Sequence, residues 1–163
     1  MKFVNLLNPY ELPPQDPLAV GLQQRRARER FPELVAVSRL RYWRGMEDLR
    51  RHRSALVVVL AASYALPELR LADAIDDGLA KRTDDFPVYV CDVFDNDALT
   101  QVEEALGRRR TYVVTPLAAY WRGHEFVEIA NGKTAFELVL RVLQFPVSID
   151  PLYVLPPPRE LFD

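Results

Sequence analysis

The sequence predicts an α/β fold in which a mixed central sheet is flanked by helices. First, Ala55 to Ala62 form a continuous apolar run, which is typical of a central strand covered on both faces. Second, segments with strand and helix periodicity alternate on either side of that run. Third, two strand-like runs follow each other directly around the turn Arg122-Gly123-His124, which favours an antiparallel hairpin.

The elements before the central strand are predicted from caps and short apolar runs. Residues 1–15, rich in Pro and Asn, predict an irregular arm. A helix is expected from about Asp16 to Arg30, with Asp16 as N-cap and Pro17 at the first helical position. We expect this helix to be an addition to the core. Leu34 to Val37 then predicts a short strand, and Gly45 to His52 a short helix.

The next elements follow from periodicity. Leu66 to Lys81 repeats apolar residues near the 3.6-residue period of an amphipathic helix. Phe86 to Val93 predicts a buried strand, and Asp97 to Leu106, closed by Gly107, predicts a helix.

The last elements are the two hairpin strands and a final helix. The strands are expected over Tyr112 to Tyr120 and Glu125 to Ile129, and the helix opens at Gly132 and Lys133. The core therefore has the order β-α-β-α-β-α-β-β-α, preceded by the N-terminal helix.

Composition narrows the function classes. Hydrophobic residues make up 49% and charged residues 27%, and the net charge is -2, which gives no strong attraction to nucleic acid or to a membrane surface. A single cysteine, Cys91, excludes an internal disulfide, and two histidines are too few for a zinc or iron centre. No run approaches the roughly 18 apolar residues of a membrane helix. We expect a cytoplasmic protein with no cofactor, no metal and no membrane insertion.

Two charge patterns have both a structural and a functional interpretation. The basic runs Arg25 to Arg30 and Arg50 to Arg53 are typical of solvated helix faces, with a docking surface for an acidic partner as the alternative. Asp92, Asp95 and Asp97 near a strand end suggest a metal site, but this pattern is more typical of a turn and an N-cap.

The element order and two local motifs resemble the thioredoxin family. Thioredoxins place Trp-Cys-Gly-Pro-Cys between their central strand and second helix, and the turn here is Tyr64-Ala65-Leu66-Pro67-Glu68, with the aromatic residue and the proline in place. Thr115-Pro116 matches the position of the family's cis-proline, since a cis peptide is tolerable at a turn-adjacent X-Pro bond. The resemblance implies a thioredoxin-like domain over residues 33–143, between an N-terminal arm and helix (1–32) and a Pro-rich tail (144–163).

The sequence differs from the thioredoxin family at the residues that carry out disulfide exchange. Ala65 and Glu68 stand where the two cysteines belong, and neither side chain can attack a disulfide sulfur. The buried acid of the family's central strand corresponds to Val59. Cys91 lies in a predicted buried strand and is expected to be structural. Because these residues are missing, we expect a redox-inactive protein of this fold rather than an enzyme.

The peptide-binding surface of the family is expected to remain. Thioredoxins hold an extended peptide near the active-site turn and the cis-proline by backbone hydrogen bonds. The corresponding residues here are Tyr64, Ala65, Leu66, Pro67, Glu68, Thr115 and Pro116. This surface is apolar apart from Glu68, which we expect at its rim. We expect it to bind another protein or a peptide, and packing of Tyr64 and Leu66 against the chain's own arm or tail is the open alternative.

Among thioredoxin relatives without the two cysteines, the chain is similar to accessory proteins of uptake-hydrogenase maturation. That similarity implies a chaperone, adaptor or assembly factor that holds the hydrogenase small subunit or its export signal. The stretch from Glu68 to Asp97, with nine acids and three bases, would meet a basic twin-arginine signal. The tail end, Pro156 to Asp163, is a candidate docking motif or a segment lying on its own domain. Homodimer formation stays open.

The rival class is an enzyme with a non-thiol site. Ser63 and Tyr64 at the start of a helix resemble the hydroxyl with which glutathione transferases hold a thiolate, because amide N–H groups and the helix dipole favour an anion there. The chain is too short for the helical second domain of those enzymes, and no acid-serine pair follows Pro116.

Overall fold

The computed structural model describes residues 3–7, 17–107 and 114–144. In chain order the elements are a 3-10 helix η1 (Val4–Leu7), α1 (Pro17–Ala36), β1 (Arg41–Tyr42), α2 (Met46–Arg50), β2 (Ser54–Leu60), α3 (Leu66–Ala80), β3 (Val88–Asp92), α4 (Asn96–Leu106), β4 (Leu117–Arg122), β5 (Glu125–Asn131) and α5 (Lys133–Leu143). None of these helices is long and apolar enough to cross a lipid bilayer.

The five strands form one mixed sheet in the order β1-β3-β2-β4-β5. β3 pairs in parallel with both β1 and β2, whereas β4 pairs antiparallel with β2 and with β5. A parallel βαβ half joined to a C-terminal hairpin and helix in this strand order is a thioredoxin-like fold. The predicted fold class is confirmed.

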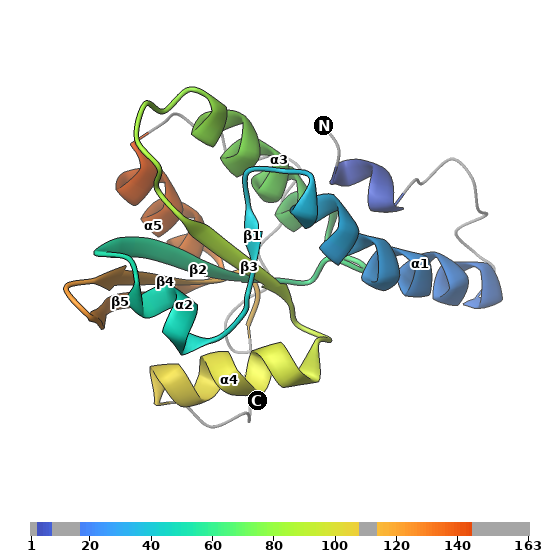
Figure 1. The fold of residues 1–163 in the computed structure, drawn as a ribbon. Coiled ribbons are helices and arrows are strands. Elements are labelled where there is room, and N and C mark those ends of the chain that lie inside the picture. The colour runs from blue at the N-terminus through green and yellow to red at the C-terminus, as the bar shows by residue number, and fades with distance from the viewer. Residues whose placement is uncertain (1–2, 8–16, 108–113, 145–163) are drawn as a thin grey trace.

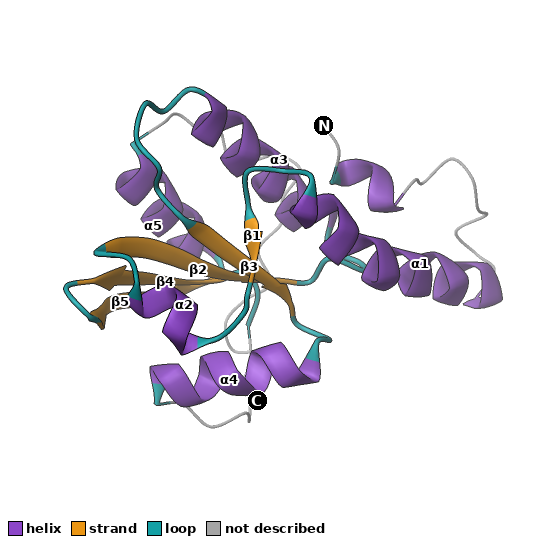
Figure 2. Ribbon diagram, viewed as in Figure 1, coloured by secondary structure: helices purple, strands orange, loops and turns teal. Residues whose placement is uncertain are grey.

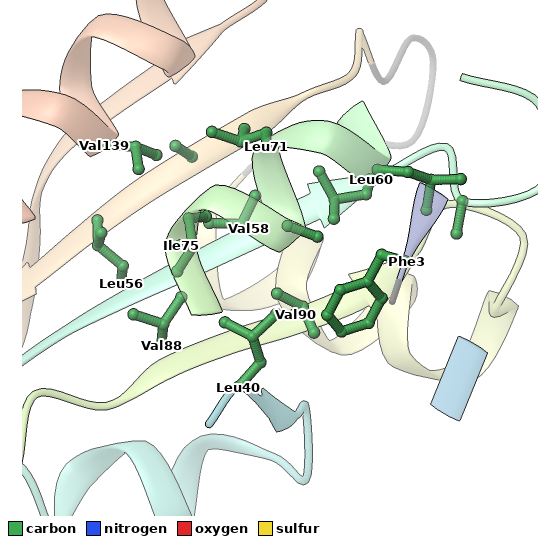
Figure 3. Close-up of a cluster of buried hydrophobic side chains, with 14 of the residues drawn as sticks. Phe3, Leu40, Leu56, Val58, Leu60, Leu71, Ile75, Val88, Val90 and Val139 are labelled. Carbon is green, nitrogen blue, oxygen red and sulfur yellow. The ribbon is translucent and has the colours of Figure 1, made fainter. Parts of the chain in front are cut away.

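Helices cover both faces of the sheet (Figures 1 and 2). α3 and α5 lie on one face, and α2 and α4 lie on the other. The central strand β2 alternates between the two cores: Leu56, Val58 and Leu60 enter the first, and Ala55, Val57 and Val59 enter the second. Figure 3 shows the first core, where Leu56 and Val58 lie near Ile75 of α3 and Val139 of α5.

The N-terminal helix belongs to this core, contrary to the prediction that it is an addition. Ala27, Phe31 and Val35 recur every four residues along α1, and each is 0% exposed. Phe3, just before η1, packs in the same cluster (Figure 3). Apolar residues at this spacing share one helix face, so the helix continues through the run Leu34 to Val37. The strand predicted there is wrong.

The first strand lies further along the chain, at Arg41–Tyr42, and pairs with Tyr89 and Val90 of β3. It is a two-residue edge strand defined by backbone pairing, so it carries no apolar run that a sequence pattern detects. The division of the chain at residue 32 stays a prediction, although α1 continues past it to Ala36. The proposed N-cap Asp16, the predicted strand start at Tyr112 and the tail (145–163) lie outside the described residues.

Predictions made from local turn chemistry agree with the structure. Gly107 ends α4 in the left-handed conformation, with φ 68°. The turn around Gly123 connects β4 and β5 as a hairpin. The end of α4 and the hairpin turn depend on residues close in sequence, which is why the sequence was sufficient for them. The Thr115-Pro116 bond, whose isomer the sequence left open, is cis.

Candidate functional site

The turn after β2 and the cis-proline segment before β4 meet at one edge of the sheet. β2 ends at Leu60, the turn leads into α3 at Leu66, and β4 begins directly after Pro116. Because Val59 pairs with Leu117, the two segments are neighbours at the carboxyl end of β2. The structure therefore brings together the two motifs that the sequence placed 47 residues apart, Glu68 and Thr115.

Glu68 lies beneath the turn and not at the rim of the surface, so the sequence prediction for this residue is wrong. Its side chain is 4% exposed. Helical side chains point back toward the helix N-terminus, and Glu68 is in the first turn of α3. Its Oε1 accepts a hydrogen bond from the backbone N–H of Ala61 at 3.1 Å, and its Oε2 accepts one from the Thr115 hydroxyl at 3.1 Å. The carboxylate thus links the turn to the cis-proline segment.

Burial raises the pKa of Glu68 to about 7, although the hydrogen bonds from Ala61 and Thr115 act in the opposite direction. A second carboxylate, Asp92 at the end of β3, is 3% exposed and adds to the rise. Burial also raises the pKa of Asp92. Two acids therefore lie below the turn, although the central strand itself carries Val59 at the family's acid position.

Asp95 serves as a helix cap, in agreement with the turn and N-cap interpretation. Its Oδ1 accepts a hydrogen bond from Ala98 N–H at 3.1 Å, and its Oδ2 accepts one from the Tyr42 hydroxyl at 2.7 Å. Within the described ranges, no group of three His, Cys, Asp or Glu side chains is placed to hold a metal ion.

The outer face of the site carries two exposed aromatic rings. Tyr64 is 54% exposed and Phe94 is 44% exposed. Their ring centroids are 5.8 Å apart, with an interplanar angle of 66°. Sequence analysis did not select Phe94; its signal was an apolar residue just past a strand that ends at the same sheet edge, where α/β folds bind ligands.

The remaining predicted residues are less exposed. Ala65, Leu66 and Pro67 are partly exposed, as is Thr115, whereas Pro116 is buried. Val114 C=O accepts a hydrogen bond from the Asn131 amide at 2.9 Å, and Pro116 C=O accepts one from Gly132 N–H at 2.9 Å. Between them, the backbone N–H and C=O of Thr115 have no hydrogen-bond partner within the part of the chain that the structure describes.

Neither thiol chemistry nor the predicted hydroxyl site finds support in this geometry. Cys91 is buried as predicted, and burial raises the pKa of its thiol, as do the charges of Asp95 and Asp92. Ser63 is 0% exposed, and its Oγ has no partner among the described residues. Burial and the charge of Glu68 raise the pKa of Tyr64, which keeps this phenol protonated.

The known proteins that are similar to this chain share little sequence with it. No protein-family model and no curated protein matches the chain. Among solved structures, it is similar to the oxidised thioredoxin from Plasmodium falciparum at 15% identity, over 64% of this chain and 98% of that one, with a TM-score of 0.48. It is also similar to the Malassezia sympodialis thioredoxin Mala s 13 at 12% identity, over 66% and 90%, with a TM-score of 0.48. The fold assignment follows from the strand order and pairing.

Proposed function

We propose that this protein is a redox-inactive, thioredoxin-like binding protein that acts as a chaperone, adaptor or assembly factor. It holds an extended segment of a partner protein across the turn Tyr64–Glu68 and the Thr115-Pro116 bond. Disulfide exchange needs a thiolate, and Ala65 and Glu68 supply none at the turn. The chain's one thiol, Cys91, is buried in β3.

The observation that carries the proposal is the link through Glu68. The carboxylate fixes the turn to the cis-proline segment by hydrogen bonds to Ala61 N–H and the Thr115 hydroxyl. The turn and the cis-proline segment are therefore held together by hydrogen bonds of Glu68, with no cysteine involved.

At that edge the backbone N–H and C=O of Thr115, which have no hydrogen-bond partner among the described residues, can pair with an extended chain. The exposed ring of Tyr64 and the partly exposed side chain of Leu66 lie on the turn beside Thr115, where they can make apolar contacts with the partner segment. Backbone pairing supplies affinity and side-chain contacts supply selectivity in this mode of recognition.

The binding proposal is tested by affinity capture from the native host. The baits are the wild-type chain, Leu66→Glu and Pro116→Ala, with Val127→Glu as the matched control. Val127 is 49% exposed on β5 and lies near the hairpin turn, away from the cis-proline. Partners captured by the wild type and by Val127→Glu should be lost with both site variants. Retention of those partners by both site variants would exclude this surface as the binding site.

The absence of redox activity is tested separately by insulin reduction in the presence of dithiothreitol. We expect no acceleration by the wild type, and no difference for Cys91→Ala. Turnover that depends on Cys91 would overturn the proposal.

A finer proposal names the partner as the hydrogenase small subunit, on the similarity to hydrogenase-maturation accessory proteins. Co-purification of a tagged chain with the small subunit, before cofactor assembly and export, is the direct test. A partner set without any hydrogenase component would remove this assignment and leave the general binding function in place.

A further inference from the structure

We propose that α1 extends the peptide-binding surface, and that Arg28 on this helix selects a partner segment with an acidic side chain next to an apolar one. This inference rests on the proposed function and adds the chemistry of the partner. It is carried by the cluster of Arg28, Phe94 and Tyr64, called the Arg28 cluster below.

The Arg28 cluster joins three separate elements at the edge of the site. The guanidinium carbon of Arg28 lies 4.1 Å from the ring centroid of Phe94, and Phe94 meets the ring of Tyr64 edge to face at 5.8 Å. Tyr64 belongs to the turn, so the cluster is continuous with the proposed peptide site. Figure 1 shows α1 running past this edge of the sheet.

The arrangement leaves the guanidinium able to bind a carboxylate. Stacking on an aromatic ring occupies the face of a guanidinium, while its N–H groups point outward in the plane. Those N–H groups match a carboxylate in a bidentate pair. Arg28 is exposed and has no ion-pair partner among the described residues, in contrast to Arg25, which pairs with Glu29 at 3.8 Å.

Part of the acidic stretch between Glu68 and Asp97, which the sequence analysis matched to a basic partner, is used inside the domain. Of its nine acids, four are buried: Glu68, Asp73, Asp76 and Asp92. Asp73 accepts hydrogen bonds from the backbone N–H groups of Phe3 and Val4, and Asp76 accepts one from Arg39 N–H.

Two more of these acids are paired with arginine at the other end of β3. Asp84 pairs with Arg82 at 2.8 Å, and Asp85 pairs with Arg41 at 3.1 Å. Most of the stretch therefore serves internal contacts. Arg28 is exposed beside the rings of Phe94 and Tyr64, and its charge also acts to lower the pKa of the buried Asp92. No ion pair occupies its N–H groups among the described residues, and charge complementarity favours an acidic segment.

The test uses a random-peptide display library, selected on the full-length wild-type chain. Bound sequences should be enriched in Asp or Glu at one position beside an apolar residue. A synthetic peptide with the selected sequence should bind Arg28→Glu about tenfold more weakly, because attraction becomes repulsion. Arg30→Glu changes the net charge equally on the same helix and should stay within about twofold. Salt at about 1 M should reduce the acidic preference.

The outcomes separate this inference from the proposed function. Peptides that bind the wild type and lose binding with Leu66→Glu, but show no acidic enrichment, overturn the role of Arg28 and leave the binding function intact. An equal loss with Arg28→Glu and Arg30→Glu also overturns it, because the charge of the helix in general would then be responsible. Selection of no peptide that distinguishes the wild type from Leu66→Glu contradicts the proposed function itself.

Discussion

Replacing Glu68 by Gln removes one buried charge while keeping the size of the side chain. The pKa of this carboxyl group is about 7 in the folded chain, against an ordinary value of 4.5. Between these two values the unfolded chain releases the proton while the folded chain retains it. The free energy of unfolding of the wild type therefore falls as pH rises through this window, and it levels off above pH 7.

The size of the effect follows from the same two pKa values. A difference of one pH unit corresponds to about 1.4 kcal/mol, so the ionised Glu68 costs the folded state about 3 kcal/mol at about pH 8. Gln carries no charge and can still accept from Ala61 N–H. The stability of Glu68→Gln relative to the wild type should therefore increase by about 3 kcal/mol between pH 4.5 and 8.

Urea unfolding at a series of pH values measures this change, with the fluorescence of the two buried tryptophans, Trp43 and Trp121, as the signal. Asp77→Asn is the matched control, because Asp77 is exposed on the same helix. Its stability relative to the wild type should stay flat over the same range. Parallel curves for the wild type and Glu68→Gln would refute the claim that Glu68 is a buried carboxylate of the site.

Three further predictions concern the core, the thiol and the link at the site. Phe31→Ala should lower the free energy of unfolding by about 3 to 5 kcal/mol in urea titrations, since Phe31 is 0% exposed. The control Val37→Ala, at an exposed position, should change it by less than about 0.5 kcal/mol. Equal effects of the two substitutions would exclude α1 from the core. Cys91 should react with a thiol reagent only after unfolding, and rapid reaction in the native state would contradict its burial. Thr115→Val should cost about 1 kcal/mol above pH 7 by removing the hydrogen bond to Glu68, and no loss there would contradict the link.

The parts of the fold that local chemistry determines were predictable from the sequence. The apolar run of β2, the hairpin turn around Gly123, the end of α4 at Gly107 and the cis-capable Thr115-Pro116 bond each depend on neighbouring residues. β1 was misplaced because Val35 continues the four-residue spacing of α1, while the real strand has two residues and pairs through its backbone. The position of β1 is set by its backbone pairing with β3, which a local sequence pattern does not contain.

The candidate site was predictable in position but not in detail. Its motifs mark the turn and the cis-proline, and the structure brings them together. Glu68 is buried and accepts a hydrogen bond from Thr115, 47 residues further along the chain, a contact that no local pattern contains. Arg28 and Phe94 likewise meet only because α1 packs against the sheet edge. Contacts between distant segments therefore supplied the chemistry that the sequence analysis missed.

The central claim is that the turn and the cis-proline segment contact a partner protein. The most direct measurement places the photo-crosslinking amino acid benzoylphenylalanine at Tyr64, where an exposed aromatic ring already stands, and at Val127 as a matched exposed position on β5. On irradiation in the native host, we predict a discrete crosslinked partner from position Tyr64 that is absent from position Val127. Crosslinks from Val127 alone, or the same products from both positions, would contradict the claim.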